Sequence, residues 1–306
     1  TGVQTCALPI LALACGMPMS FLRSVCFNGR EKDTRMSGSI GASHSASYDY
    51  VIIGAGSAGC VLANRLTEDG KSSVAVLEAG GSDRSVLIQM PTALSIPMGM
   101  KKYNWSYHTE PEPFLDGRRM DLPRGKVLGG SSSINGMVYI RGNALDYEEW
   151  EKLGAKGWGY RHVLPYFRRA ETRAEGGDPY RGNEGPLHTS YGRLENPLYN
   201  VFVEAARQAG YPPTADVNGY QQEGFGRMDR TIHKGRRWSA ASAYLKPAMR
   251  RSNLHVITDA QATQLLFHQH RATGVAYRQD GEIKTINARR EVILSGGPIN
   301  SPHLLK

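Results

Sequence analysis

The sequence has 306 residues, of which 40% are hydrophobic and 21% charged, and its formal net charge is +9. This length and composition are typical of a globular protein with one large or two ordinary domains, and they exclude a disordered tail. The positive charge is dispersed, without a Lys/Arg block, so we expect no nucleic-acid partner. His268 and His270 lack further ligands nearby, so we predict no metal site and place both on the surface.

Residues 1–47 are predicted to form a leader that precedes the fold, and the first ten of them resemble translated adapter sequence. From position 20 to 47 the chain carries seven serines and four basic residues against two acidic ones. This composition is typical of a mitochondrial transit peptide. We therefore expect a mitochondrial protein, with a secretory signal or an uninformative tail as the alternatives. Cys60 is the one cysteine after the leader, which favours a reducing compartment.

A strand, a glycine-rich turn, a helix and a second strand follow in the order of a βαβ unit. The apolar run YDYVII (48–53) predicts the first strand, and SAGCVLANRLTED (57–69) continues with helical spacing. SSVAVLEAG (72–80) predicts the second strand. The two strands should be parallel and joined by a right-handed crossover.

The turn has the spacing Gly54-x-Gly56-x-x-Gly59, which is typical of a dinucleotide-binding site. Gly54 permits the tight turn, Gly56 lets the backbone approach a pyrophosphate, and Gly59 lets the helix pack against the strand. The helix N-terminus offers unpaired N–H groups to phosphates. Glu78 ends the second strand, where its carboxylate can accept hydrogen bonds from ribose hydroxyls. This turn predicts an adenine dinucleotide and leaves FAD and NAD open.

Residues 124–142, RGKVLGGSSSINGMVYIRG, contain a second cluster of glycines and serines. Their open backbone N–H groups suit an anion or a polar ring. A nicotinamide enzyme has no need of this second nest, whereas a flavin must be held at both its pyrophosphate and its ring, so the two clusters together favour FAD. Between them, residues 81–123 lack periodicity and carry five prolines, which is unusual unless the segment covers a ligand.

The remaining elements follow in chain order. The helix predicted over 195–210 has Asn196 as its cap and Gly210 at its left-handed end. Asp280-Gly281 predicts a hairpin. His233, beside basic residues, is assigned a polar role in a loop. The Arg236-Arg237 pair could support an anion electrostatically, but we assign it to the solvated surface. The other predicted elements are helices at 144–153 and 163–172, strands at 254–258, 263–267, 274–279 and 282–287, and a buried strand within 291–297.

Several stretches carry a resemblance to a known family. Residues 124–142 resemble the first signature of the glucose–methanol–choline (GMC) oxidoreductases, and GPINSPHLL (297–305) resembles the start of the second. KKYNWSYHTEPEP (101–113) and NGYQQEGFGRMDRTIHKGRRWSAASAYL (218–245) are similar to the branch of that family that oxidises choline in animal mitochondria. The resemblance covers about residues 48–306.

The residues and the resemblance together predict an α/β fold. A doubly wound, Rossmann-like FAD-binding domain with an inserted β-meander is interleaved with an incomplete α+β substrate-binding domain. The predicted segments are the leader (1–47), the first part of the FAD-binding domain (48–185), the start of the substrate-binding domain (186–250) and the second part of the FAD-binding domain (251–306).

The resemblance implies cofactor-binding roles at matching positions. The first turn would hold the pyrophosphate and Glu78 the ribose, while the second cluster would line the flavin, with Trp105 near the flavin and Ala262 near the adenine. Ile134 stands where some relatives carry a histidine bonded to the flavin, so FAD is expected to be bound non-covalently. The implied residues are Gly54, Gly56, Ser57, Ala58, Gly59, Glu78, Ala79, Trp105, Val127, Gly130, Ser131, Asn135, Gly136, Met137, Val138 and Ala262.

The resemblance also implies FAD-dependent oxidation of a primary alcohol by hydride transfer to flavin N5, with choline and betaine aldehyde as the expected substrate and product. The family's catalytic histidine is expected beyond Lys306, so we assign no catalytic residue here and expect the 306-residue chain alone to be inactive.

The implied electron acceptor is not NAD, and peripheral association with the mitochondrial inner membrane is also implied. Two alternatives stay open. One is a non-catalytic FAD-binding or interaction product, and the other is a GMC alcohol oxidase that uses oxygen and acts on another alcohol.

Overall fold

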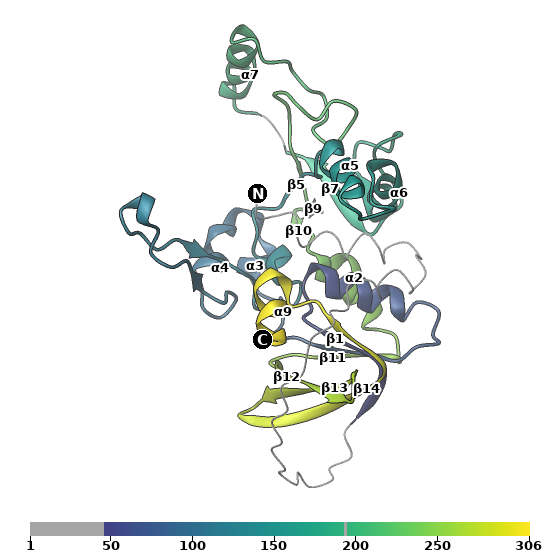
Figure 1. Ribbon diagram of the computed structural model, residues 1–306. Coiled ribbons are helices and arrows are strands. Elements are labelled where there is room, and N and C mark those ends of the chain that lie inside the picture. The colour runs from purple at the N-terminus through teal and green to yellow at the C-terminus, as the bar shows by residue number, and fades with distance from the viewer. Residues whose placement is uncertain (1–45, 193–194) are drawn as a thin grey trace.

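The computed structural model describes residues 46–192 and 195–306. Their two larger sheets lie apart, the six-stranded one at the bottom of the view in Figure 1 and the four-stranded one above α2 (Ser57–Leu66). The predicted leader therefore lies outside the described residues apart from its last two, and Ser47 already begins the first strand. The larger sheet has six strands, and its central strand β1 (Ser47–Ile53) lies between β2 (Val74–Leu77) and β14 (Glu282–Leu294).

The six-stranded sheet is parallel on one side and antiparallel on the other. Strands β11 (Leu254–Ile257), β2, β1 and β14 run parallel, whereas β14 pairs antiparallel with β13 (Arg271–Gln279), which in turn pairs with β12 (Gln261–His268). The predicted α/β fold with a parallel, Rossmann-like sheet and an inserted meander is thereby confirmed. The hairpin predicted at Asp280-Gly281 is also confirmed, since both residues have positive φ angles of 54° and 83°.

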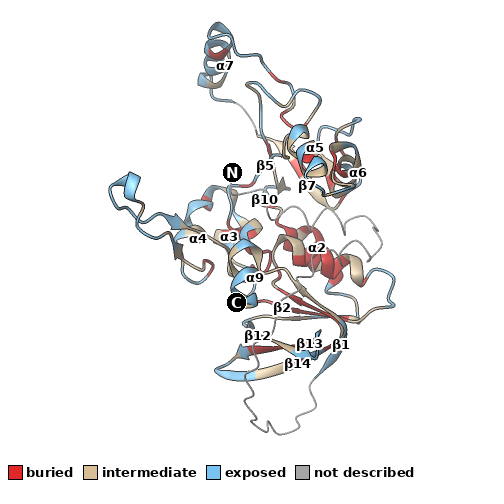
Figure 2. Cartoon of the chain, in the orientation of Figure 1, coloured by how far each residue is buried: buried red, intermediate tan, exposed pale blue. Residues whose placement is uncertain are grey.

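Helix α2 (Ser57–Leu66) covers one face of this sheet, as predicted (Figure 2). Its apolar side packs with β1 and β2 and with a π-helical turn at Ala241–Leu245, which runs into α8 (Lys246–Ala248). The opposite face buries side chains of β1, β2, β13 and β14, and Leu304 of α9 (Gly297–Leu305) packs against that cluster. The core thus holds the carboxyl end of β1 and the start of α2 in fixed positions.

Several predicted elements differ in their limits. The strands expected at 282–287 and 291–297 are one strand, β14, because its first half pairs with β13 and its second half with β1. Helix α6 (Tyr160–Ala170) begins three residues before the predicted start and ends where β6 pairing begins at Glu171. Helix α7 (Leu198–Gln208) begins after Pro197, and the Asn196 side chain accepts a hydrogen bond from the Leu198 N–H at 3.0 Å.

The segment at 81–123, expected to be irregular, contains short elements. They are α3 (Val86–Gln89), a 3₁₀ turn at Pro91–Ala93, α4 (Ser95–Gly99), β3 (Tyr107–His108), a 3₁₀ turn at Pro113–Leu115 and β4 (Asp121–Leu122). A further 3₁₀ turn at Gly130–Ser133 follows within the second glycine cluster.

The second sheet has four strands and lies beside α5 (Ala144–Lys152) and α6 (Figure 1). Its strands in order are β5 (Val138–Tyr139), β8 (Asp229–Arg230), β7 (Leu187–Tyr191) and β6 (Glu171–Arg173), and β9 (Ile232–His233) and β10 (Arg236–Arg237) form a separate hairpin. The predicted division into domains stays a prediction.

Buried ion pairs hold the four-stranded sheet together. The fully buried guanidinium of Arg181 contacts carboxylate oxygens of Glu171, Asp216 and Asp229 at 2.5, 2.7 and 2.7 Å. Glu171 also pairs with buried Arg141 at 2.7 Å. Each buried charge has an opposite charge in contact, which is the condition under which ion pairs are tolerated inside a protein.

Gly59→Ala should destabilise the fold by about 3 kcal/mol, because a Cβ at this position would lie 1.9 Å from the Gly54 carbonyl oxygen and would push α2 away from β1. Gly99→Ala is the matched control, since a Cβ there meets nothing within 4 Å. Urea unfolding of both variants measures the difference. Equal unfolding free energies for the two variants would contradict the proposed close packing of α2.

Candidate cofactor-binding site

The first turn leaves the backbone of β1 and α2 open to a ligand. Gly54 has a φ of +99° and donates its N–H to the Leu77 carbonyl oxygen at 2.7 Å. Gly56 precedes α2 without a side-chain cap, so no side chain competes for the first N–H groups of the helix at Ser57 and Ala58. Free N–H groups at a helix N-terminus favour a phosphate.

Glu78 joins the end of β2 to this turn. Its carboxylate oxygens accept hydrogen bonds from the N–H groups of Ala55 at 2.9 Å and Gly80 at 2.8 Å. Ala79 lies between Glu78 and Gly80 in the chain. The side chain is buried, and burial raises its pKa to about 7, although the two N–H donors act in the opposite direction. Each oxygen has a further lone pair, so the carboxylate can still accept a hydrogen bond from a hydroxyl group.

The second glycine cluster lies directly against the first. A Cβ on Gly130 would lie 2.8 Å from the Gly56 Cα, and Gly129 donates its N–H to the Ala55 carbonyl oxygen at 2.7 Å. Both Gly129 and Gly130 have positive φ angles, of 89° and 53°. The tertiary structure therefore brings together two motifs that the sequence presents separately, and only glycine allows this approach.

The end of β14 forms a third wall that the sequence analysis missed. Ser295 donates its N–H to the Ile53 carbonyl oxygen at 2.8 Å, and its own carbonyl oxygen lies 2.6 Å from where a Gly54 Cβ would be. Its hydroxyl group is buried and has no hydrogen-bond partner among the described residues. The sequence feature that could have revealed Ser295 is its position as a polar residue between a strand and two consecutive glycines. An open glycine cradle with an unpaired hydroxyl fits a phosphate-bearing dinucleotide.

The segment from Ser131 to Val138 presents an exposed surface beyond the cradle. Ser131, Asn135, Gly136 and Val138 are exposed, while Met137 is buried with a φ of +63°. The side chains of Val127 and Ile134 instead pack in a buried cluster with Ile88 and Tyr103. Val127 can therefore face a cofactor only through its backbone.

Trp105 and Ala262 lie at the margins of this arrangement. Trp105 donates its N–H to the Arg124 carbonyl oxygen at 2.9 Å, and its ring stacks on Tyr107 with centroids 5.9 Å apart. Ala262 lies on β12, two residues after Ala260, whose N–H donates to the Glu78 carbonyl oxygen at 2.9 Å. Trp105 is thus next to the segment leading into the second cluster, and Ala262 is near the end of β2.

One assignment to the solvated surface is wrong. Arg237 is 1% exposed, although its neighbour Arg236 is exposed as expected. The error arises because the Arg237 side chain turns inward and bonds to Ile88 and Asn135, which the local sequence does not reveal. His233, for which a polar role in a loop was predicted, lies on β9 and is half-buried, and its ring stacks on His188 with centroids 3.8 Å apart.

The surface position expected for His268 and His270 is confirmed, since both are exposed. Residues 46–192 and 195–306 contain no group of three or more His, Cys, Asp or Glu residues placed to hold a metal ion.

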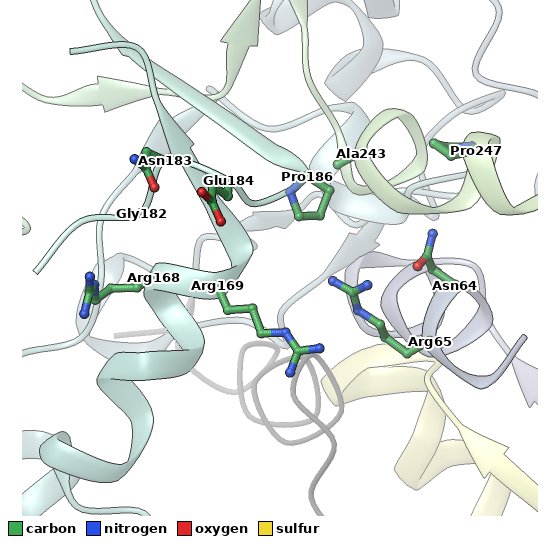
Figure 3. A pocket seen from close by; sticks show the side chains of 10 residues that line it. All are labelled: Asn64, Arg65, Arg168, Arg169, Gly182, Asn183, Glu184, Pro186, Ala243 and Pro247. Carbon is green, nitrogen blue, oxygen red and sulfur yellow. The ribbon is translucent and has the colours of Figure 1, made fainter. Parts of the chain in front are cut away.

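A cavity of about 670 Å³ lies away from the glycine cradle, between the C-terminal turn of α2, the end of α6 and the loop before β7 (Figure 3). Its charged lining is Arg65, Arg168, Arg169 and Glu184. None of the predicted cofactor-binding residues lines it. The first glycine turn lies instead at the opposite, N-terminal end of α2.

Comparisons with known proteins agree with this geometry. The chain is 57% identical over 261 residues to the oxygen-dependent choline dehydrogenase of Vibrio vulnificus (strain YJ016), covering 85% of this chain and 47% of the relative. It is 56% identical over 257 residues to the protein of the same name from Sinorhizobium fredii, covering 84% and 47%. The crystal structure of pyridoxine 4-oxidase from Mesorbium loti superposes with a TM-score of 0.80 at 33% identity, covering 84% of this chain and 51% of that one.

The expected mitochondrial location and transit peptide are not supported. These relatives are bacterial choline dehydrogenases rather than mitochondrial proteins, which contradicts the location. The transit-like segment itself lies outside the described residues. Within residues 46–192 and 195–306, no helix is both long and apolar enough to cross a membrane.

The chain spans about half the length of the curated relatives it matches. The family model described as GMC oxidoreductase matches residues 48–306, which is the whole of the predicted globular part. With the two glycine clusters in contact and the sheet ending at them, the chain belongs to the GMC oxidoreductases, a family of FAD-binding flavoproteins.

Proposed function

We propose that this chain is the FAD-binding part of an oxidoreductase that converts a primary alcohol, choline, to its aldehyde, betaine aldehyde. The observation that carries the proposal is the contact between Gly56 and Gly130, which builds one cradle from two motifs. The substrate is proposed because the relatives at 57% and 56% identity are named choline dehydrogenases. Bound FAD would supply the acceptor for the hydride that leaves the alcohol carbon.

The residues of this chain would bind and orient the cofactor. Gly56 and the first turn of α2 would offer backbone N–H groups to the pyrophosphate, while Gly54 and Gly59 shape the turn that leaves room for it. Glu78 would accept a hydrogen bond from the ribose, as its remaining lone pairs allow. Ser295 would add a hydroxyl group, since its own is buried without a partner in the described structure.

FAD would be held without a covalent bond. Ile134 occupies the position where some relatives are expected to carry a flavin-linked histidine, and its side chain is 2% exposed in an apolar cluster. An aliphatic side chain has no nucleophilic atom. The exposed groups of Ser131, Asn135 and Gly136 would instead make polar contacts with the ring system.

The proton of the alcohol would be taken by a histidine from a part of the protein outside these 306 residues, since no residue here is assigned as the base. Oxygen is the proposed electron acceptor, because the relatives are named oxygen-dependent. Peripheral membrane association stays a prediction.

The 306-residue chain should bind FAD, but choline should not reduce the bound flavin, because the cradle is present and the proposed base is not. The same chain extended to the relatives' length should lose its flavin absorbance when choline is added without oxygen. Absorbance spectroscopy of both proteins checks this. Sustained reduction of the short chain would refute the missing base, and an extended chain that binds FAD but is not reduced by any primary alcohol would favour a non-catalytic binding protein.

Gly130→Ala should weaken FAD binding by at least about tenfold, which is about 1.4 kcal/mol. Its Cβ would lie 2.8 Å from the Gly56 Cα at a φ of +53°, so the two clusters must separate. Titration of the apoprotein with FAD, followed by flavin fluorescence, measures the dissociation constant. Gly99→Ala, at an open position outside the cradle, should keep the wild-type affinity. Equal affinities for both variants would show that the contact does not shape the site.

Glu78 should make the stability of the apoprotein pH-dependent. Its pKa is about 7 in the folded chain against an ordinary value of 4.5, so its contribution to stability is complete below pH 4.5 and is lost as the pH rises through 7. The loss amounts to about 3 kcal/mol. Glu78→Gln cannot ionise, so the unfolding free energy of wild type relative to this variant should fall over that range.

Glu184→Gln is the control for this pH profile, because Glu184 is exposed and makes no ion pair with the described residues. The unfolding free energy of Glu184→Gln should change with pH in the same way as that of wild type between pH 4.5 and 8. The upper limit of this range is about one unit above the pKa of Glu78. Parallel profiles for wild type and Glu78→Gln would mean that the carboxyl group of Glu78 is not buried as described.

A further inference from the structure

Arg237 is a buried cation whose hydrogen bonds all go to neutral oxygens. It is 1% exposed and ends the β9–β10 hairpin. Its Nε donates to the Ile88 carbonyl oxygen at 2.9 Å, and its Nη1 donates to the Asn135 carbonyl and side-chain oxygens at 2.6 and 2.9 Å. Nη2 is buried without a hydrogen-bond partner in the described part of the chain. A guanidinium group in this state is far from fully satisfied.

No carboxylate among the described residues compensates this charge. Burial alone lowers the pKa of Arg237 to about 10, with no opposing charge acting on it, whereas Arg181 in the second sheet has its pKa raised by Glu171 and neighbouring acids. Arg237 is nevertheless still protonated at neutral pH. An unpaired buried charge is strongly unfavourable, and a nearby group that carries or gains negative charge would offset that penalty.

The charge lies directly under the segment predicted to line the flavin. The Asn135 side-chain oxygen accepts from Arg237 and also from the Met137 N–H, at 3.1 Å. Met137 has a left-handed φ of +63°, which is unfavourable for a side chain of this kind. Thr231, which precedes β9 at the same open end of the hairpin as Arg237, donates its N–H to the Met137 carbonyl oxygen at 2.8 Å. Hydrogen bonds from Arg237 to Asn135 and from Thr231 to Met137 thus attach the hairpin to this segment.

We propose that Arg237 is a positioning residue whose unbalanced positive charge stabilises the reduced state of FAD held over residues 135–138. The inference rests on the proposed function, since it requires FAD at this site. A flavin that accepts a hydride gains two electrons and one proton, so it acquires a negative charge. A fixed cation nearby favours that state and raises the midpoint potential of the bound flavin.

The test is the two-electron midpoint potential of bound FAD, measured by photoreduction against a reference dye, which requires no alcohol turnover. Arg237→Met removes the charge at similar volume and should shift the balance between oxidised and reduced flavin at least about tenfold toward oxidised, a fall of about 30 mV. Arg237→Lys keeps the charge but not the forked contacts, so it should retain the wild-type potential while binding FAD less tightly. Arg236→Met removes an exposed neighbouring charge and should leave the potential unchanged.

Should Arg237→Met fail to fold, Asn135→Asp decides the question together with Arg237→Lys. A carboxylate at position 135 would lie about 2.9 Å from the guanidinium and neutralise it, so the potential should fall as for the methionine variant. Wild-type potentials in both Arg237→Met and Asn135→Asp, or an equal fall in Arg237→Lys and Arg237→Met, would overturn the inference. If the wild-type chain binds no FAD, the proposed function itself fails.

Discussion

The close approach of two backbone segments is the constraint on which the structure depends. Gly59 lets α2 lie against the Gly54 carbonyl oxygen, and Gly130 lets the second cluster lie against Gly56. A side chain at Gly59 or Gly130 would occupy space already filled by backbone atoms. The core of the six-stranded sheet supports this contact from below, because β1, β2 and β14 all end at the turn. The site is therefore a product of chain packing rather than of a single loop.

Some buried charged groups in this chain contact an opposite charge, and others contact only neutral groups. In the four-stranded sheet, Arg181 meets carboxylates on several sides, so the charges are balanced within the protein. At the candidate site, Glu78 and Arg237 are buried with neutral hydrogen-bond partners. Balanced charges stabilise a scaffold, whereas unbalanced ones keep a capacity to respond to a ligand. This contrast supports the view that the glycine cradle, and not the arginine-lined cavity, is the functional centre.

The features that were predicted well are those encoded by local spacing. The βαβ unit, the Asp280-Gly281 hairpin and the family resemblance each follow from residues adjacent in the chain. The errors concern contacts between distant segments. Arg237 was assigned to the surface because its neighbours are polar, yet the hairpin turns it inward beneath Asn135. The location inferred from the leader failed for another reason, since composition alone cannot tell a transit peptide from other basic, serine-rich sequence.

The sequence by itself determined the secondary-structure order, the dinucleotide turn and the family, because each depends on residue types at fixed short spacings. Tertiary structure decided how the site is closed. Only the folded chain places Gly130 on Gly56, Ser295 beside the first turn and an unpaired guanidinium under residues 135–138. These contacts join segments far apart in the chain, so they arise from the packing of the sheet, helix and hairpin together and leave no periodic signal in the sequence.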